Sequence, residues 1–308
     1  NFKSNPNNEK IRIRDAAKQL SCSEAELLST EVDGSNIKFL FIENFNIFFK
    51  DLLKIDKIMF LIRTDSVVHE KIIMTSSLRY TENKFYDIED ESPVLLFNYE
   101  VIMFSFYERK QHGKKFLRSF QFFDINGDSV IKIYLKSKDE LKFDALSNKY
   151  VISYNFEVQD KVDKMMKSTS SKANNWVNQY NLFDDYHSSK FVNKTLLRKI
   201  FEEVSKASFP ISIYGIVDKV IQFHNGLIKN IVDFGPWLNI IDKTFNIHAM
   251  ENKIDKNHLF TYNYDENIYY SIEFFDVNNL HVLGIRACSG FEEDFNKILI
   301  KIGVIDEI

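Results

Sequence analysis

Seven histidines are the side chains of this sequence best suited to bind a metal or to exchange protons near neutral pH. A helical zinc pair needs two histidines four residues apart, and no two of them have that spacing. For most of them a surface or hydrogen-bonded structural role is the simpler interpretation. His69 and His248 lie in apolar, strand-like runs, which makes them better candidates for a buried site than His112 or His258.

Cationic side chains beside aromatic ones are the second chemical resource. Arg63, Arg118, Lys164 and Arg286 have such surroundings. Their charged groups could hold the carboxylates of an acidic, otherwise apolar ligand. The competing interpretation is that they are solvated charges at strand ends, and the residues alone favour it. A duplicated α+β protein with an apolar cavity is as far as these side chains lead.

The sequence contains no strong catalytic signature, and we predict no catalytic residue. It lacks a Gly-rich phosphate loop, G-x-S-x-G, H-E-x-x-H and C-x-x-C. Residues 124–128 (Asp-Ile-Asn-Gly-Asp) begin like a calcium loop, but the glycine comes too early and the closing glutamate is missing. Cys22 and Cys288 cannot form a disulfide framework or a zinc cage by themselves.

Composition favours a folded cytoplasmic protein. The chain has 308 residues, 44% hydrophobic and 27% charged, which is typical of about two globular domains. Its 40 basic and 44 acidic residues argue against a broad nucleic-acid surface. No stretch approaches the roughly 18 apolar residues of a spanning helix, and residues 1–10 do not resemble a signal peptide. We therefore expect no membrane insertion.

The elements that must position these side chains occur twice. A shift of 152 residues aligns 119–126 (Ser-Phe-Gln-Phe-Phe-Asp-Ile-Asn) with 271–278 (Ser-Ile-Glu-Phe-Phe-Asp-Val-Asn). The same shift aligns Phe49 with Phe201. A common shift over almost 100 residues indicates an internal duplication rather than chance. It predicts repeats at 1–150 and 151–308.

Each repeat has the pattern of a few helices packed on an antiparallel β-sheet, so the predicted fold class is α+β with a tandem duplication. Helices are expected near 46–54 and 192–206. Short β-branched or aromatic runs predict strands at 57–63, 67–73, 101–107, 116–123 and 130–135.

Turn and capping signals separate these elements. Asn126-Gly127 predicts a hairpin turn in which both residues tolerate positive φ. Ser23-x-x-Glu26 precedes an apolar pair in an early helical segment. Ser137-x-x-Glu140 and Ser289-x-x-Glu292 predict capping boxes at the helix that closes each repeat.

Several strings resemble the bacterial haemin-degrading and haem-trafficking family (the HemS, ChuS and HmuS type), which is itself an internal duplication. Residues 14–28 are similar to its opening, and 62–70 resemble T-R-N-x-x-A-V-H-E. Residues 118–134 resemble S-x-Q-F-F-D-x-x-G-D-A-x-x-K-x-Y, and 235–248 resemble G-W-x-N-x-x-x-P-x-F-x-L-H-L. The resemblance covers residues 10–302, and it implies two haem-utilisation repeats.

The resemblance implies a cytoplasmic protein of haem and iron uptake that binds one haem in a cleft between its halves. Haem would be its ligand or its substrate, because some members open the porphyrin ring with an external electron donor and others pass haem to an oxygenase. A haem oxygenase or an inner-membrane haem transporter is the further partner that it implies.

The family's iron ligand is a histidine on a helix early in the second half. The loosely aligned helix here is 159–167, with Lys164 at the ligand position. His187 lies later and would need a shifted helix to take that role, and it is our candidate for the metal ligand. A lysine could serve only if burial lowered its pKa enough to free the lone pair.

The rest of the family pocket is also altered. Val94 stands where an arginine of an L-R-L-F strand belongs, which removes a polar group near the iron. Tyr262 replaces a lysine expected at a propionate, and Arg286 keeps the arginine of an L-Y-G-x-R string that has lost its tyrosine. His248 fits the L-H-L string and is expected to be structural, with a second, weak haem site as the alternative.

Two functions follow from these residues. The first is a haem carrier that uses altered ligands, with or without degradation of haem to release iron; carriage asks less of the pocket than oxygen activation does. The second is a divergent relative that has lost the haem ligands and acts as a non-enzymatic binding or interaction protein. The family resemblance favours the first, which is our interpretation, and the better preservation of fold strings than of pocket residues favours the second.

Overall fold

The structure is a computed structural model, and it describes residues 11–152, 186–192, 196–264 and 267–306. The chain forms two compact units that are not continuous in sequence. The first unit contains Asn1–Ile58 and Asn98–Lys172, and the second contains Met59–Phe97 and Ala173–Ile308. These units do not coincide with the repeats 1–150 and 151–308, whose boundaries stay a prediction.

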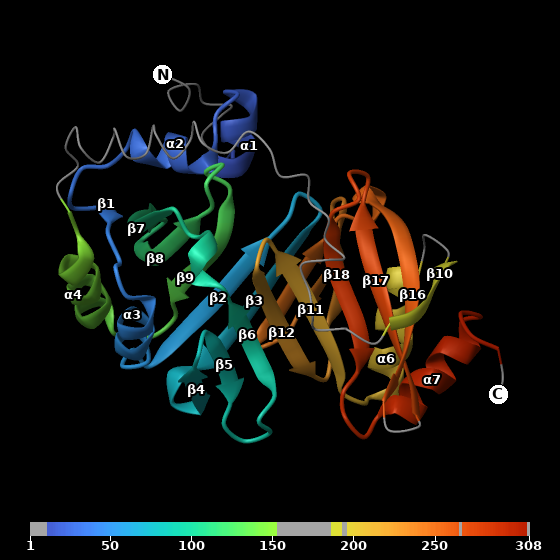
Figure 1. Cartoon of the computed structure of the whole chain (residues 1–308). Helices are drawn as coiled ribbons and strands as arrows, with labels where there is room; N and C mark the ends of the chain where they lie inside the picture. Colours follow the sequence, from blue (N-terminus) through green and yellow to red (C-terminus); the bar gives the residue numbers. More distant parts are fainter. Residues whose placement is uncertain (1–10, 153–185, 193–195, 265–266, 307–308) are drawn as a thin grey trace. The chain divides into compact units, whose positions relative to one another are not determined.

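The first unit packs helices on antiparallel strands (Figure 1). Its described helices are α1 (Ile13–Gln19), α2 (Glu24–Ser29), α3 (Phe45–Leu52) and α4 (Glu140–Tyr150). Its strands have the order β1-β7-β8-β9, with the bounds Ile37–Leu40, Phe104–His112, Lys115–Phe123 and Ser129–Leu135. Phe48 of α3 contacts Phe120 and Phe122 of β8 at ring-centroid distances of 5.1 and 5.7 Å, which places the core between helix and sheet.

The early capping signal is confirmed. Ser23 Oγ accepts a hydrogen bond from the Glu26 amide at 3.1 Å, and the Glu26 carboxylate accepts one from the Ser23 amide at 2.7 Å. This reciprocal pair satisfies two amides that a helix start would otherwise leave without partners.

The two later capping boxes were predicted wrongly. α4 follows Asp139 and α7 (Glu292–Lys301) follows Phe291, and neither of these residues makes a side-chain cap. Ser137 Oγ instead lies 3.2 Å from Asp139 Oδ2, and Ser289 is exposed. Both helices begin two residues later than the boxes require, so the serines lie before the first turn.

The Asn126-Gly127 turn is present, with a different conformation. Gly127 has a φ of 75°, whereas Asn126 has a negative φ. The Asp124 carboxylate accepts hydrogen bonds from the amides of Asn126 and Asp128 at 2.9 and 2.8 Å. This side-chain turn fixes the chain direction, so only the glycine needs the left-handed region.

The second unit contains two sets of strands. One has the order β2-β3-β15-β14-β13, and β2 begins in the first unit. The other has nine strands in the order β10-β16-β17-β18-β11-β12-β6-β5-β4. The bounds, in that order, are Lys57–Arg63, Val67–Met74, Phe245–Ala249, Trp237–Ile241 and Ile231–Phe234, then Tyr186–Val192, Ile254–Tyr264, Asn267–Asp276, His281–Ala287, Ile211–Val217, Val220–Gly226, Pro93–Phe97, Lys84–Asp87 and Leu78–Thr81.

The repeats exchange strands inside the second unit. β6 of the first repeat pairs antiparallel with β12 of the second, with Leu96 opposite Ile221. β15 of the second repeat pairs antiparallel with β3 of the first, with Ile247 opposite His69. Each repeat therefore adds a three-strand meander to the other repeat's strands. This exchange explains why the compact units and the repeats divide the chain differently.

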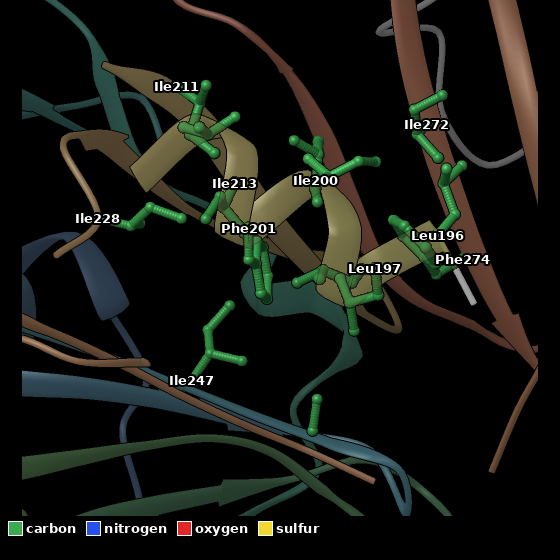
Figure 2. Packing of buried hydrophobic residues seen from close by; sticks show 14 of the residues in the cluster. Leu196, Leu197, Ile200, Phe201, Ile211, Ile213, Ile228, Ile247, Ile272 and Phe274 are labelled. Carbon is green, nitrogen blue, oxygen red and sulfur yellow. The ribbon is translucent and has the colours of Figure 1, made fainter. Parts of the chain in front are cut away.

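The core of the second unit lies on one face of the nine-stranded sheet (Figure 2). Helix α6 (Leu196–Ala207) turns Leu197, Ile200 and Phe201 toward that face, a spacing typical of an amphipathic helix. The strands contribute Ile213 and Ile272 to the same buried cluster. Because strand side chains alternate between faces, the neighbouring positions lie on the opposite face of the sheet.

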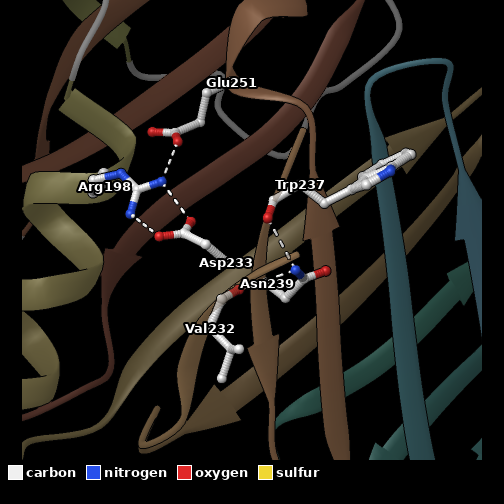
Figure 3. A network of polar contacts seen from close by, with 6 residues as sticks. All are labelled: Arg198, Val232, Asp233, Trp237, Asn239 and Glu251. Carbon is white, nitrogen blue, oxygen red and sulfur yellow. Dashed lines mark hydrogen bonds and ion pairs between the residues drawn. The ribbon is translucent and has the colours of Figure 1, made fainter. Parts of the chain in front are cut away.

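A polar network ties α6 to the edge strand β13 (Figure 3). The Arg198 guanidinium donates to both carboxylate oxygens of Asp233 at 2.8 and 3.2 Å and to Glu251 at 2.6 Å. The two carboxylates raise the pKa of Arg198 further, so it stays charged. This forked geometry is the strong form of the arginine–carboxylate contact.

Candidate functional site

A cavity of about 760 Å³ lies in the second unit, where β18 passes into α7. Its volume falls within the range of small-molecule sites. Both repeats line it: Asp90 and Pro93 come from the first, and Tyr262, Arg286 and Cys288 come from the second. Strand exchange makes this possible, because it brings β6 and the loop before it to the second repeat's sheet.

Arg286 is the cation among the described lining residues of this cavity, which also include Asp90 and Glu292. It lies on β18, directly opposite Ser212 of β11 and Ser271 of β17. Its guanidinium carbon lies 5.7 Å from the ring centroid of Tyr214, which is within cation–π distance. Burial raises the pKa of Tyr262, and the charge of Arg286 and its hydrogen bond to the Tyr262 hydroxyl oppose that rise.

The structure thus brings together the two residues predicted for propionates. Tyr262 and Arg286 both line the cavity, and Tyr262 also stacks on Tyr269 with ring centroids 5.3 Å apart. The aromatic faces suit a flat apolar ligand, and the guanidinium suits a carboxylate at its edge.

Cys288 adds a thiol to the cavity wall. Burial raises its pKa to about 11, although a hydrogen bond with the Gly226 backbone and the charge of Arg286 lower it. The thiol is therefore protonated at neutral pH. Haem iron takes cysteine as the thiolate, so the protonated Cys288 is poorly suited to ligate it, and the described lining residues include no histidine.

Of the two candidates for the iron ligand, Lys164 and His187, only His187 has a described backbone position. Lys164 lies outside the described residues. The backbone of His187 lies in β10, at a β-bulge between Tyr186, which is opposite Tyr262, and Ser188. His187 is thus part of a strand and not of the helix that the family's ligand requires. That strand neighbours the one that carries Tyr262, and the role of His187 stays a prediction.

Val94 and Arg63 do not line the cavity. Val94 lies in β6, buried at 3% exposure, next to the lining residue Pro93. Arg63 ends β2. Valine at position 94 offers only apolar contact, so the polar group that the resemblance places there is missing.

His248 has a hydrogen-bond partner in a neighbouring strand. Its Nδ1 lies 2.6 Å from the Asn239 side-chain oxygen. The Asn239 amide donates to the backbone carbonyls of Val232 and Trp237, both at 3.0 Å (Figure 3). The imidazole thus completes a network that joins β13, β14 and β15.

His69 is a core residue and not a lining residue. It is 1% exposed, and its ring packs edge-on against Phe245 at a centroid distance of 5.0 Å. Neither ring nitrogen has a hydrogen-bond partner among the described residues. Burial and, to a smaller extent, the charge of Lys71 lower the pKa of His69 to about 3.

This buried neutral histidine predicts a pH-dependent stability. The unfolded chain takes up a proton near pH 6.5 and the folded chain only near pH 3, so stability falls as the pH drops below 6.5. Between pH 7 and pH 5, His69 should remove about 2 kcal/mol from the free energy of unfolding. Urea unfolding at both pH values should show a loss that is larger by this amount in the wild type than in His69→Leu.

Ile247→Val is the matched control, because Ile247 lies opposite His69 in the sheet and carries no titratable group. It should lower stability equally at both pH values. His224, whose pKa burial also lowers, contributes in the same direction in every variant. An equal loss between the two pH values in the wild type and in His69→Leu would contradict the prediction.

The described residues contain neither a candidate metal cluster nor a helix that could span a membrane. No group of three or more histidine, cysteine, aspartate or glutamate side chains there could hold a metal ion. No helix among those residues is long and apolar enough to cross a membrane.

Sequence reasoning missed Ser212, Tyr214 and Glu273. They lie on the same face of the sheet as Arg286, because Tyr214 and Glu273 are the register partners of Gly284, two residues from Arg286, and alternate residues of a strand share a face. The signal was available: polar residues at alternate positions of otherwise apolar strands. It is visible only once the neighbouring strands are known.

Comparison with known proteins supports the family resemblance seen in the sequence. The profile of the haemin-degrading HemS.ChuX domain matches residues 21–150 and 179–287, so it matches both repeats. No curated protein matches the sequence.

Two solved structures have the same fold over nearly their whole length. The heme degrading enzyme ChuS of Escherichia coli O157:H7 superposes with a TM-score of 0.80 at 17% identity, over 96% of this chain and 95% of that one. Holo-PhuS, a heme-binding protein from Pseudomonas aeruginosa, gives 0.77 at 18% identity, over 95% and 94%. At this identity the likeness shows the fold, and the double profile match shows the family. The chain belongs to the haemin-degrading HemS.ChuX domain family.

Proposed function

We propose that this protein binds haem in the cavity of its second unit, as a cytoplasmic step of bacterial haem and iron uptake. One observation carries the proposal: Arg286 is hydrogen-bonded to Tyr262 and lies over the Tyr214 ring, beside a cavity that the stacked rings of Tyr262 and Tyr269 line. Haem is a flat apolar ring with two carboxylates, so it needs aromatic or apolar walls and a cation at one end. Family membership and the relatives named for heme binding and heme degradation support it.

Carriage is the better-supported form of this function. The buried Val94 leaves no polar side chain at the position where one would assist oxygen chemistry. Carriage needs only a cavity and a ligand, for which we propose His187. A haem oxygenase or an inner-membrane haem transporter would then receive or supply the haem.

A second candidate is a family member that no longer binds haem and acts as a non-enzymatic binding protein. The absence of histidine from the described lining of the cavity favours it. The same experiment separates the two candidates.

Titration of the purified protein with haemin, followed by the Soret band, tests the proposal. Wild type should give a saturable one-to-one shift. Arg286→Ala should weaken the affinity about tenfold, because a charge-assisted hydrogen bond contributes about 1.5 kcal/mol or more. His187→Ala and Lys164→Ala identify the ligand, since loss of the iron ligand shifts the Soret position as well as weakening the affinity.

The control is Arg118→Ala, in the first unit, where the Arg118 Nε bonds Asp144 at 2.8 Å. It removes the same side chain and should leave the titration unchanged. No specific shift with wild type at micromolar protein would refute haem binding and leave the second candidate. If haemin binds, incubation with ascorbate shows whether the ring is also opened.

A further inference from the structure

An unsatisfied hydroxyl group lies beside Arg286. Ser212 is 3% exposed and lines the cavity, and its Oγ has no hydrogen-bond partner among the described residues. A buried polar group without a partner costs about 1–3 kcal/mol, which a native protein rarely tolerates without a reason. Because Ser212 is the register partner of Arg286, the two side chains leave neighbouring strands on the same face of the sheet.

A buried network underlies this pair. The Tyr214 hydroxyl donates to Glu273, and His281 Nε2 lies 2.7 Å from the other oxygen of the same carboxylate. The three side chains are 1–7% exposed. Tyr214 also stacks on His281 with an angle of 8° between the ring planes. Arg286 therefore lies over the ring of Tyr214, and the hydroxyl at the far end of that ring is held by the Glu273 carboxylate.

Gly284 leaves the space that this network needs. A Cβ at position 284 would lie 2.2 Å from Tyr214 Cζ and 2.5 Å from a Glu273 oxygen. Gly284 stands between the two side chains, opposite Tyr214 in β11 and opposite Glu273 in β17. Tyr214 can reach Glu273 across the central strand only because no side chain lies in between.

The first repeat has none of these features. The shift of 152 residues places Phe60, Ile62, Gln121, Lys132 and Tyr134 opposite Ser212, Tyr214, Glu273, Gly284 and Arg286. The two copies share their strands but differ at all five positions. The network is therefore specific to the second repeat, which supplies Ser212 and Arg286 to the cavity.

We propose that Ser212 and Arg286 together bind one carboxylate of the ligand, and that Tyr214, Glu273 and His281 form a positioning network that holds Arg286 for it. The inference rests on the proposed haem binding, since haem supplies the carboxylate. It adds a second donor and a reason for the fixed orientation of the arginine. A planar guanidinium gains most when it is preorganised, because less side-chain freedom is lost on binding.

The experiment compares haemin with haemin dimethyl ester, whose carboxylates are blocked, on Ser212→Ala and Tyr214→Phe. Each variant should weaken haemin binding about fivefold, which corresponds to about 1 kcal/mol. Neither should change the affinity for the ester, because the ring and the iron ligand are untouched. Tyr214→Phe keeps the aromatic ring and removes only the bond to Glu273.

Tyr107→Phe is the matched control. Its hydroxyl bonds the Asp144 carboxylate at 2.5 Å in the first unit, so the substitution removes the same kind of contact elsewhere. It should lower the thermal midpoint about as much as Tyr214→Phe does and leave both affinities unchanged.

The possible results are distinct. Equal weakening of haemin and ester, or no weakening of haemin, would overturn the carboxylate clamp while haem binding stands. Wild-type protein that binds haemin and ester with the same affinity would do the same. Failure of the wild type to bind either one refutes the proposed function and the clamp with it.

Discussion

Gly284→Ala should destabilise the protein by about 3 kcal/mol, the upper part of the range for overpacking a core. The added methyl group would lie 2.2 Å from Tyr214 Cζ and 2.5 Å from Glu273 Oε2, both far inside contact distance. Neither neighbour can move aside cheaply, because Tyr214 is 1% exposed and its hydroxyl is bonded to Glu273. Urea unfolding followed by circular dichroism measures the loss.

The first repeat suggests a rescue for this variant. It has Ile62 and Lys132 at the positions of Tyr214 and Gly284, which shows that these strands accept a side chain there when the tyrosine is absent. Gly284→Ala combined with Tyr214→Ile should therefore recover most of the lost stability but not haemin affinity. A single Gly284→Ala variant as stable as wild type would show that the tyrosine has room to move.

Local sequence signals predicted the elements well because they depend on local physics. The run 57–63 is confirmed as β2, and 67–73 as all but the last residue of β3. The α+β fold with a duplication is confirmed too. The expected helix near 46–54 is α3, one residue earlier, since Asn44 caps it by accepting a hydrogen bond from the Ile47 amide at 3.2 Å.

Strand exchange lay beyond sequence reasoning for a physical reason. Leu95 of β6 is buried in the observed pairing with β12. A pairing of β6 within its own repeat would bury it equally, because a strand of either repeat has the same alternation of inward and outward side chains. No local signal distinguishes the two pairings. The pairing of β6 depends on the packing of the whole sheet. That pairing determines which residues of the first repeat line the cavity.

The site was only partly predictable for a related reason. Tyr262 and Arg286 came from the resemblance, and the structure brings them to one cavity. Ser212 and Glu273 each appear as a single polar residue in an apolar strand, and only the register shows that they share a face. Cys288 was excluded from a metal cage by number alone, and its place in the cavity wall depends on the turn into α7.

The two repeats differ in the side chain at one equivalent position of the sheet, Gly284 in the second and Lys132 in the first. Where the second has Gly284, the first has Lys132, which is 4% exposed and bonded to Glu24 at 3.0 Å. Glu24 also accepts a hydrogen bond from Arg14 at 3.1 Å. The first repeat thus fills this space with a buried ion pair that joins α2 to β9, while the second keeps it for Tyr214.

Glu24→Ala should destabilise the first unit by about 3–5 kcal/mol, because it leaves the Lys132 ammonium buried without its carboxylate. The pair itself need not be stabilising, since desolvation of two charges offsets most of their attraction. Glu24→Leu combined with Lys132→Met should therefore recover most of the loss in urea unfolding. If the double variant were as unstable as Glu24→Ala, the contacts of Glu24 with Arg14 and α2, and not the unpaired ammonium, would account for the effect.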